Sequence, residues 1–310
     1  MTKLHLDTLL KHKVDFLLQK LLQTKFETRV SGKWILAGEH AVLRGGPALV
    51  FPLNSRRLSL SFVPDYKNLN LILSGPHGDE YQLLFWGVLE KACELCGIQR
   101  SKLTGTFLIE SSLPVGTGLG ASAALCVAVT RWLAQCDLVP QPYEFARSLE
   151  NMFHGESSGV DIAVALSGQG LRFTRAGERK ALNLDWQPQW YISYSGKRGV
   201  TLECVEKVKG LLAKKSELGL QLDQQMIAAT EQAEQALLKK DLSALVDAIN
   251  LAGNCFIQWG LSPESHIQWL QENGALAVKP TGSGGGGYVL SLWKQTPPKE
   301  ILAELISCGV

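Results

Sequence analysis

The stretch from Pro114 to Ala124 reads Pro-Val-Gly-Thr-Gly-Leu-Gly-Ala-Ser-Ala-Ala, and it constrains this chain more than any other segment. Three glycines stand at alternate positions and an apolar run begins at Leu125, so the pattern predicts a tightly turned loop that opens a helix. The amides of such a loop and the positive end of the helix dipole attract phosphate. The Walker A ending and the G-x-G-x-x-G spacing are absent from this stretch. A glycine-rich helix start can also be only a connection.

Composition excludes several classes of protein. The chain has 310 residues, 45% hydrophobic and 19% charged, and a net charge of +2. This balance gives no support for nucleic-acid binding or for electrostatic attachment to a membrane. No apolar run approaches the roughly 20 residues of a membrane span, and the N-terminus lacks the features of a signal peptide, so we expect a cytoplasmic protein. The seven cysteines are expected to be reduced thiols, without a metal or redox role for Cys93 and Cys96.

The order of elements predicts an α/β or α+β protein with two domains. Leucines at helical spacing predict an N-terminal helix within 1–25, which packs on its own chain or serves a membrane surface or a partner. The polar stretch 175–188 suggests a boundary, which gives domains at 26–180 and 181–310. Later elements are expected to include a helix with Ser262 as N-cap and a closing helix at 298–308. The first half is expected to contain separate strands at 27–30, 33–37, 47–53 and 58–62.

Three further clusters carry ionisable or glycine residues in unusual places. The segment Ser31–Leu43 is apolar but contains Lys33, Glu39 and His40. Ionisable groups in such a run are unfavourable unless they are paired or used, so they form either a site or a structural pair.

The second of these clusters runs from Glu150 to Asp161. Its two carboxylates suit a metal ligand and a proton acceptor, although Asp161 could instead cap the helix-like stretch 162–166. The third cluster is Lys279–Tyr288, in which five of the six residues at 282–287 are glycine. This density suggests close approach of the backbone to a ligand.

Taken together and in this order, the four clusters resemble the GHMP kinase family. Gly38-Glu-His-Ala-Val and His154-Gly with Ser158-Gly-Val-Asp are similar to the motifs of its mevalonate kinases, and Thr281-Gly-Ser-Gly-Gly-Gly-Gly to the third motif. The resemblance spans residues 31 to about 290. Ala121, Glu156-Ser157 and Ile162 depart from the usual pattern, the last two near the acceptor. The resemblance implies an α+β fold of two domains, the first like ribosomal protein S5 domain 2 and the second ferredoxin-like.

The resemblance also implies roles for individual residues. Asp161 would accept the proton of the attacking hydroxyl, with Lys33 beside it, and Ser122 and Glu150 would hold Mg²⁺. Residues expected to contact ATP are Pro114, Gly116, Gly118, Leu119, Gly120, Ala121, Ser122, Ala123, Gly282 and Gly284. Residues expected on the acceptor side are Glu39, His40, His154, Ser158 and Gly159, with Lys197 and Arg198 as candidates for the acceptor's carboxylate.

The implied activity is ATP-dependent phosphorylation of a small-molecule alcohol, with mevalonate favoured as acceptor. Alternatives are another GHMP kinase, acting on a sugar, phosphomevalonate or a mevalonate-like acid, and a non-catalytic relative that binds a nucleotide or metabolite as a sensor. Retention of a proton acceptor together with the phosphate loop speaks against the sensor. A homodimer is also expected, as is common in the family.

Overall fold

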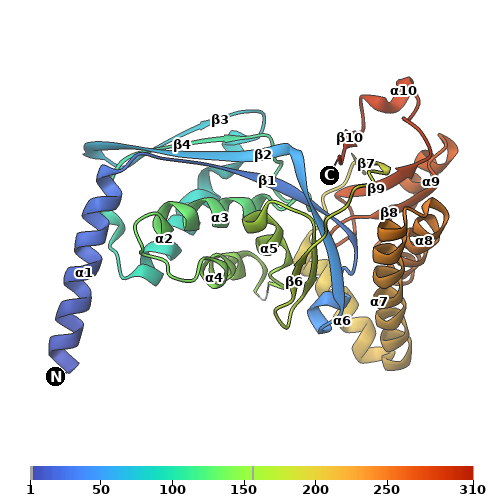
Figure 1. Cartoon of the computed structure of the whole chain (residues 1–310), viewed down its shortest axis with the longest axis horizontal. Coiled ribbons are helices and arrows are strands. Elements are labelled where there is room, and N and C mark those ends of the chain that lie inside the picture. The colour runs from blue at the N-terminus through green and yellow to red at the C-terminus, as the bar shows by residue number, and fades with distance from the viewer. Residues whose placement is uncertain (1–2, 156, 310) are drawn as a thin grey trace. The chain divides into compact units, whose positions relative to one another are not determined.

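The structure is a computed structural model that describes residues 3–155 and 157–309, with side chains at 12–153, 155 and 157–309. Helices and strands are mixed along the chain (Figure 1), as an α+β fold requires. The helices are α1 (Lys3–Gln23), α2 (Gln82–Cys96), α3 (Ala121–Ala134), α4 (Pro142–His154), α5 (Val160–Ser167), α6 (Thr201–Lys214), α7 (Ser216–Lys239), α8 (Leu242–Gln258), α9 (Glu264–Glu272) and α10 (Lys299–Leu302). Short 3-10 turns are η1 (Ala41–Arg44), η2 (Gly78–Tyr81) and η3 (Arg100–Lys102). The strands are β1 (Phe26–Ala37), β2 (Pro47–Asn68), β3 (Asn70–Ser74), β4 (Thr104–Ser111), β5 (Leu171–Thr174), β6 (Arg179–Ala181), β7 (Gln189–Tyr194), β8 (Ala277–Pro280), β9 (Tyr288–Trp293) and β10 (Ile306–Ser307).

The described residues form two compact units that interleave along the sequence. The first comprises residues up to Val30, then Arg56–Val115 and Ala121–Gly155, and the second comprises Ser31–Ser55, Gly116–Gly120 and the residues from 157 on. Strands β1 and β2 each contribute residues to both units. The sequence prediction places an N-terminal helix at 1–25 and domains at 26–180 and 181–310, and these boundaries stay a prediction about the family's domains.

In the first unit, β4 lies between β3 and β2. It pairs antiparallel with β2 on one side and parallel with β3 on the other. Its side chains alternate, with Phe107 and Ile109 buried and Leu108 exposed, as expected for a strand with one covered face. Figure 1 shows α2, α3 and α4 on one side of these strands.

Aromatic side chains form the centre of this unit. The ring of Trp132 on α3 lies 4.8 Å from the ring of Phe107 on β4 and 5.3 Å from that of Phe62 on β2. The last turns of α1 belong to the same unit, since Leu18 and Leu21 are buried and Asp15 pairs with Lys102 over 3.0 Å. The expectation that this helix packs on its own chain is therefore confirmed for these turns.

The second unit contains an antiparallel sheet with strand order β10-β7-β9-β8. Every residue of β9 is buried, which indicates that both faces of this strand are covered. Helices α7 and α8 pack on each other, and α8 packs on β8. The ring of Trp34 on β1 stacks on Phe51 of β2 at 4.7 Å and contacts Trp190 of β7 at 5.2 Å. The segment of β1 that carries Lys33 is thus fixed in a dense aromatic core.

Several local predictions are wrong. The strands expected at 27–30 and 33–37 are one strand, β1, and those at 47–53 and 58–62 belong to one strand of 22 residues, β2. The polar residues 54–57 suggested a break, but their backbone continues as strand while their side chains are mostly exposed. A strand tolerates polar residues where they meet solvent, so composition alone did not reveal the continuity.

The ends of two C-terminal helices also differ from expectation. Pro263, not Ser262, is the N-cap of α9. The expected closing helix at 298–308 is a single turn, α10, followed by β10, in which Ile306 pairs with Ile192 of β7. Apolar residues in this short segment fit either a helix or an edge strand, and pairing with β7 decides between them.

Two global expectations can be compared with the described residues. The seven cysteines are free thiols, and all but Cys96 are buried. Burial raises the pKa of Cys93 to about 12 and that of Cys96 to about 11, so both thiols are protonated at neutral pH. Among the helices at 3–155 and 157–309, none combines the length and apolar content of a bilayer-spanning segment.

Candidate active site

The glycine loop at residues 114–120, directly before α3, turns as tightly as the sequence predicts. We call it the phosphate loop after the ligand that the sequence predicts for it. Gly116, Gly118 and Gly120 have positive φ angles of 74°, 88° and 78°, a region that strongly favours glycine. The loop is anchored to β1, because the backbone N–H of Lys33 donates to the carbonyl of Leu119 over 2.9 Å. Helix α3 follows directly and has 14 residues. The loop therefore has the glycine-dependent turns that the sequence predicts for a phosphate site, and binding of phosphate by its amides stays a prediction.

Lys33 and Asp161 form an ion pair next to this loop. Nζ of Lys33 lies 3.1 Å from Oδ1 of Asp161, and the two side chains are 5% and 25% exposed. A Cβ atom on Gly120 would lie 2.8 Å from Cγ of Lys33, so the loop backbone packs directly on the lysine stem. The second unit thus brings the phosphate loop, a buried ammonium and a partly exposed carboxylate together. This proximity of residues 33 and 161 was expected.

Asp161 is not a helix cap. Helix α5 begins at Val160, and its N-cap is Gly159, with a φ of 82°. Asp161 therefore lies in the first turn of the helix, and the alternative that it caps a stretch at 162–166 is wrong. Ser157 Oγ accepts from the N–H of Gly159 over 3.0 Å, and Ser158 Oγ accepts from that of Val160 over 3.3 Å. These bonds fix the turn that presents the Asp161 carboxylate.

The first motif forms a tight turn at the end of β1. Gly38 has a φ of 103°, and a Cβ atom there would lie 2.3 Å from the carbonyl oxygen of Pro47, so only glycine fits. The next residue, Glu39, is buried and pairs through Oε1 with Nζ of Lys279 over 2.5 Å. Burial raises the pKa of Glu39, and the Lys279 ammonium opposes this shift.

His40 is buried and bound to the third motif. Its Nε2 lies 2.9 Å from the carbonyl oxygen of Ser283, and its ring packs edge-on against Trp259 at 4.9 Å. Burial lowers the pKa of His40 to about 4. The ring is therefore neutral at pH 7, and because a carbonyl only accepts, Nε2 carries the proton. Both Glu39 and His40 already contact the third motif, and their expected contact with an acceptor stays a prediction.

The third motif packs on the phosphate loop within the second unit. A Cβ atom on Gly287 would lie 2.6 Å from the carbonyl oxygen of Thr117, and one on Gly282 would lie 3.8 Å from Nζ of Lys33. Gly284 lies elsewhere, since its Cβ would meet the ring of Phe256 at 2.8 Å. Gly282 is thus beside the candidate site, whereas Gly284 packs on the interior. Binding of ATP by either glycine stays a prediction.

Ser122 and Glu150 lie on α3 and α4 of the first unit, and these helices pack on each other. Glu150 is buried. Burial and then the charge of Glu150 raise the pKa of the Cys126 thiol on α3. No group of three or more His, Cys, Asp or Glu in the described part of the chain could hold a metal alone. A hydroxyl and a carboxylate nevertheless fit Mg²⁺, which commonly takes one or two carboxylates and completes its shell with water and substrate phosphates.

Other predicted residues have simpler surroundings. The backbones of Pro114, Leu119, Ala121 and Ala123 belong to the loop and to the first turn of α3. The side chain of His154 lies outside the described residues. Arg198 places its Nε 3.9 Å from where a Cβ on Gly116 would be, so this candidate for an anionic substrate group is next to the phosphate loop.

Lys279 is the first residue of the third cluster, but sequence reasoning gave it no role and missed its pairing with Glu39. It lies on β8 with its side chain fully buried, and its ammonium also lies 5.2 Å from the ring centre of Phe256. The available signal was a lysine in the apolar run Ala277–Pro280, the same signal that singled out Lys33 and Glu39.

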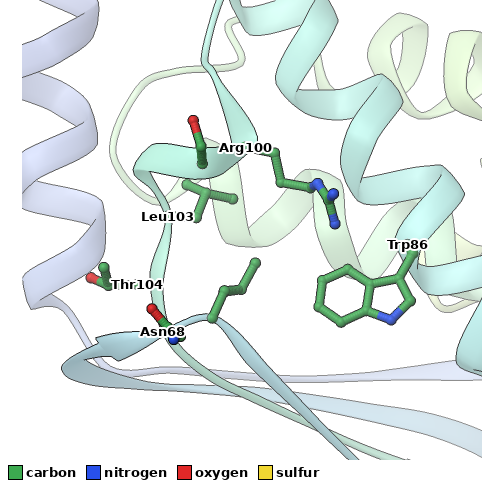
Figure 2. A pocket seen from close by; sticks show the side chains of 7 residues that line it. Asn68, Trp86, Arg100, Leu103 and Thr104 are labelled. Carbon is green, nitrogen blue, oxygen red and sulfur yellow. The ribbon is translucent and has the colours of Figure 1, made fainter.

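A separate cavity of about 300 Å³ lies in the first unit, at the start of β4. Its lining includes Asn68, Trp86, Arg100 and Thr104, and Figure 2 shows the side chain of Arg100 extending toward Trp86. Arg100 already pairs with Glu90 over 2.7 Å. The phosphate loop follows the other end of β4 along the chain, and none of the predicted site residues lines this cavity. We assign no ligand to it.

Comparisons with known proteins identify the family of this chain. The family models for the GHMP kinases N terminal domain and the GHMP kinases C terminal match residues 84–169 and 233–310. The mevalonate kinase of Aeropyrum pernix is 29% identical over 85% of this chain and 87% of its own length, and that of Archaeoglobus fulgidus is 29% identical over 86% and 92%.

Solved structures share the fold. The L. major mevalonate kinase in complex with R-mevalonate has a TM-score of 0.75 at 24% identity and covers 88% of each chain. The Methanococcus jannaschii mevalonate kinase has a TM-score of 0.73 at 18% identity and covers 93% of this chain and 98% of its own. With both domain models matched in order and the two-domain fold shared, this chain belongs to the GHMP kinase family.

Proposed function

We propose that this protein is a mevalonate kinase, which transfers the γ-phosphoryl group of ATP to mevalonate and forms 5-phosphomevalonate. The single observation that carries the proposal is the Lys33–Asp161 ion pair, 3.1 Å long, beside the glycine loop. The curated relatives named mevalonate kinase, 27–29% identical over most of the chain, support this acceptor.

Asp161 accepts the proton of the attacking hydroxyl. Its carboxylate is partly exposed, whereas its partner Lys33 is buried, so a substrate hydroxyl can approach the carboxylate while the lysine stays in place. The Lys33 ammonium stabilises the alkoxide oxygen as the proton leaves. Positioned proton transfer of this kind contributes about 10²–10⁴-fold to the rate.

The amides from Gly116 to Ser122 bind the ATP phosphates. Gly282 packs against this loop at Gly118. Ser122 and Glu150 are the residues that would hold Mg²⁺ on the phosphates. When bound, the metal neutralises charge on the phosphate oxygens during transfer. On the acceptor side we propose His154, Ser158 and Gly159 near the hydroxyl.

Two further residues are candidates for the acceptor's carboxylate. Lys197 and Arg198 lie in one loop, and Arg198 is close to Gly116. A guanidinium binds a carboxylate through two parallel hydrogen bonds, which makes Arg198 the stronger candidate of the two. A cytoplasmic location and a homodimer stay predictions from the sequence.

The test is a coupled assay of ADP release with purified full-length protein, ATP and Mg²⁺. Mevalonate, phosphomevalonate, galactose and homoserine are offered separately, and the product is identified by mass spectrometry. We expect a phosphorylated product with mevalonate. Turnover with mevalonate should be at least 100-fold faster than with each of the other three acceptors.

Each other outcome changes the proposal. Faster turnover with another acceptor keeps the kinase and replaces mevalonate. Binding of ATP without ADP release for any of the four acceptors favours the non-catalytic sensor. ADP release that does not depend on the acceptor identifies an ATPase, and the proposal is then wrong.

A further inference from the structure

The second unit contains four charges of alternating sign on three sequence-distant segments. Asp161 pairs with Lys33 over 3.1 Å, and Glu39 pairs with Lys279 over 2.5 Å. The two pairs are close in space, because a Cβ atom on Gly282, three residues after Lys279, would lie 3.8 Å from Nζ of Lys33. Burial raises the pKa of Glu39, and the Lys33 ammonium also opposes this shift, although less than Lys279 does. Lys33 therefore interacts with two carboxylates, that of Asp161 in the candidate active site and that of the buried Glu39.

The Glu39–Lys279 pair is closed to solvent. The side chains are 2% and 0% exposed. Nζ of Lys279 also lies 3.4 Å from the carbonyl oxygen of Ile35, and its ammonium lies against the Phe256 ring. Within the described residues, the second oxygen of Glu39, Oε2, is buried without a hydrogen-bond partner. A buried carboxylate with one free oxygen strongly attracts any nearby cation, and Lys279 is the cation bound to it.

The Glu39–Lys279 pair lies at the C-terminal end of β1, the strand that carries Lys33. Lys279 is on β8 and Glu39 is in the turn after β1. Two residues beyond Lys279, Thr281 Oγ1 accepts from the N–H of Ile35 over 2.8 Å and donates to its carbonyl over 3.0 Å. Ile35 is itself two residues from Lys33, so the C-terminal end of β8 is fixed to β1 close to Lys33.

We propose that Lys279 is a positioning residue for phosphoryl transfer: it neutralises Glu39 and thereby leaves the ammonium of Lys33 to Asp161. Without Lys279, the carboxylate of Glu39 competes with Asp161 for Lys33. The lysine then moves or shares its charge, and Asp161 loses its partner in the site. This inference rests on the proposed function, since the affected step is transfer to the acceptor hydroxyl.

The experiment is a double-mutant cycle on the full chain with Lys279→Met, Glu39→Gln and the two combined. Steady-state kcat and KM values for ATP and mevalonate are measured, and thermal unfolding is followed for each variant. We expect Lys279→Met to lower kcat at least 30-fold while KM for ATP changes less than threefold. The double variant should recover at least tenfold of that kcat, because the competing carboxylate is gone.

Lys209→Met is the matched control, since Lys209 is an exposed lysine of the same unit that pairs with Glu206. It should leave kcat and KM unchanged. If Lys279→Met does not fold, Lys279→Gln replaces it, because the amide can still donate to Glu39 but leaves its charge uncompensated.

Three results would overturn the inference while the proposed function stands. One is an unchanged kcat in Lys279→Met with only a lower unfolding temperature, which would make the pair purely structural. Another is a double variant as slow as or slower than Lys279→Met, which would mean that Glu39 or Lys279 touches the substrate. The third is an equal loss of kcat in Lys209→Met. Absence of turnover by the wild-type protein with every acceptor would instead overturn the proposed function, and this inference with it.

Discussion

The two buried lysine–carboxylate pairs of the second unit use the same residue types in different surroundings. The Lys33–Asp161 pair is open on one side, because a quarter of the Asp161 side chain is exposed. The Glu39–Lys279 pair is closed on all sides, and its glutamate and lysine are almost or completely inaccessible. In the open pair the carboxylate can exchange water for a substrate hydroxyl. In the closed pair no exchange is possible without opening the fold.

The difference shows that burial, not separation, decides what an ion pair does. Burial raises the pKa of Glu39 and lowers that of Lys279, and each shift is opposed by the partner's charge. Removing one partner therefore leaves an uncompensated group in the interior, which is strongly destabilising. The closed pair is suited to fixing the backbone, and the open pair to chemistry.

Asp161→Asn is expected to have the largest effect on the open pair. The amide keeps the shape of the side chain but cannot accept the hydroxyl proton, so kcat should fall by about 10²–10⁴-fold. ATP affinity, measured by titration calorimetry, should stay within about threefold, because the phosphate loop is unchanged. The matched control is Asp185→Asn, an exposed aspartate paired with Lys240, which should keep the wild-type kcat. A variant Asp161→Asn with normal kcat would remove the chemical role from the open pair.

His40, which directly follows Glu39 of the closed pair, is expected to make the stability of the folded protein sensitive to acid. Burial lowers the pKa of His40 from 6.5 to about 4, so between these values the unfolded chain binds a proton that the folded protein does not. The neutral His40 contributes its full share to the free energy of unfolding above pH 6.5. This free energy falls by on the order of 3 kcal/mol as the pH drops toward 4.

The measurement is the free energy of unfolding in urea at pH 7, 5.5 and 4. His40→Asn suits the comparison because asparagine does not titrate and its side-chain amide keeps an N–H donor. The variant should be less stable at pH 7 but should lose less stability than the wild type on acidification. Equal losses of stability in both proteins would show that protonation of His40 does not cause the sensitivity to acid.

These two regions also mark how far the sequence alone could lead. The Lys33–Asp161 contact was expected because both residues match motifs of one family, and the ion pair confirms it. The Glu39–Lys279 contact was not expected, although both residues stand in apolar runs. A buried charge in a sequence predicts that a partner exists, but which partner depends on the packing of β8 against β1, and no local pattern encodes that.

The fold shows the same division between local and distant information. Helix α1, Lys3–Gln23, lies within the predicted range 1–25, and α3 begins directly after the glycine loop as predicted, because apolar spacing and glycines are local signals. The continuity of β2 through residues 54–57 and the replacement of a closing helix by β10 depend on strands that are distant in the sequence. Periodicity within one segment cannot report such pairing.

Gly120→Ala tests how firmly the open pair depends on the loop behind it. The residue has a φ of 78°, and the new methyl group would lie 2.8 Å from Cγ of Lys33. The backbone strain is worth about 1–2 kcal/mol, and displacement of Lys33 should lower kcat by roughly tenfold, or about 1.4 kcal/mol. Gly168→Ala is the matched control, because its φ is 69° and nothing lies within 4 Å of the added methyl. A similar loss of kcat in both variants would mean that strain alone, and not Lys33, is responsible.

The smallest effect on stability is expected for an ion pair that has the same N–O separation as the Lys33–Asp161 pair but is exposed to solvent. Nζ of Lys209 lies 3.1 Å from Oε1 of Glu206, the same separation as in the Lys33–Asp161 pair, but these side chains are 55% and 59% exposed. Water and salt screen such a pair, so Lys209→Met should change the free energy of unfolding by less than about 0.5 kcal/mol. Lys279→Met, in the closed pair, should lower it by about 3–5 kcal/mol, since it leaves a buried carboxylate without its cation. Urea unfolding of both variants at pH 7 measures the contrast. Equal changes would mean that separation rather than burial sets the strength of these pairs, and the distinction between an open and a closed pair would lose its physical basis.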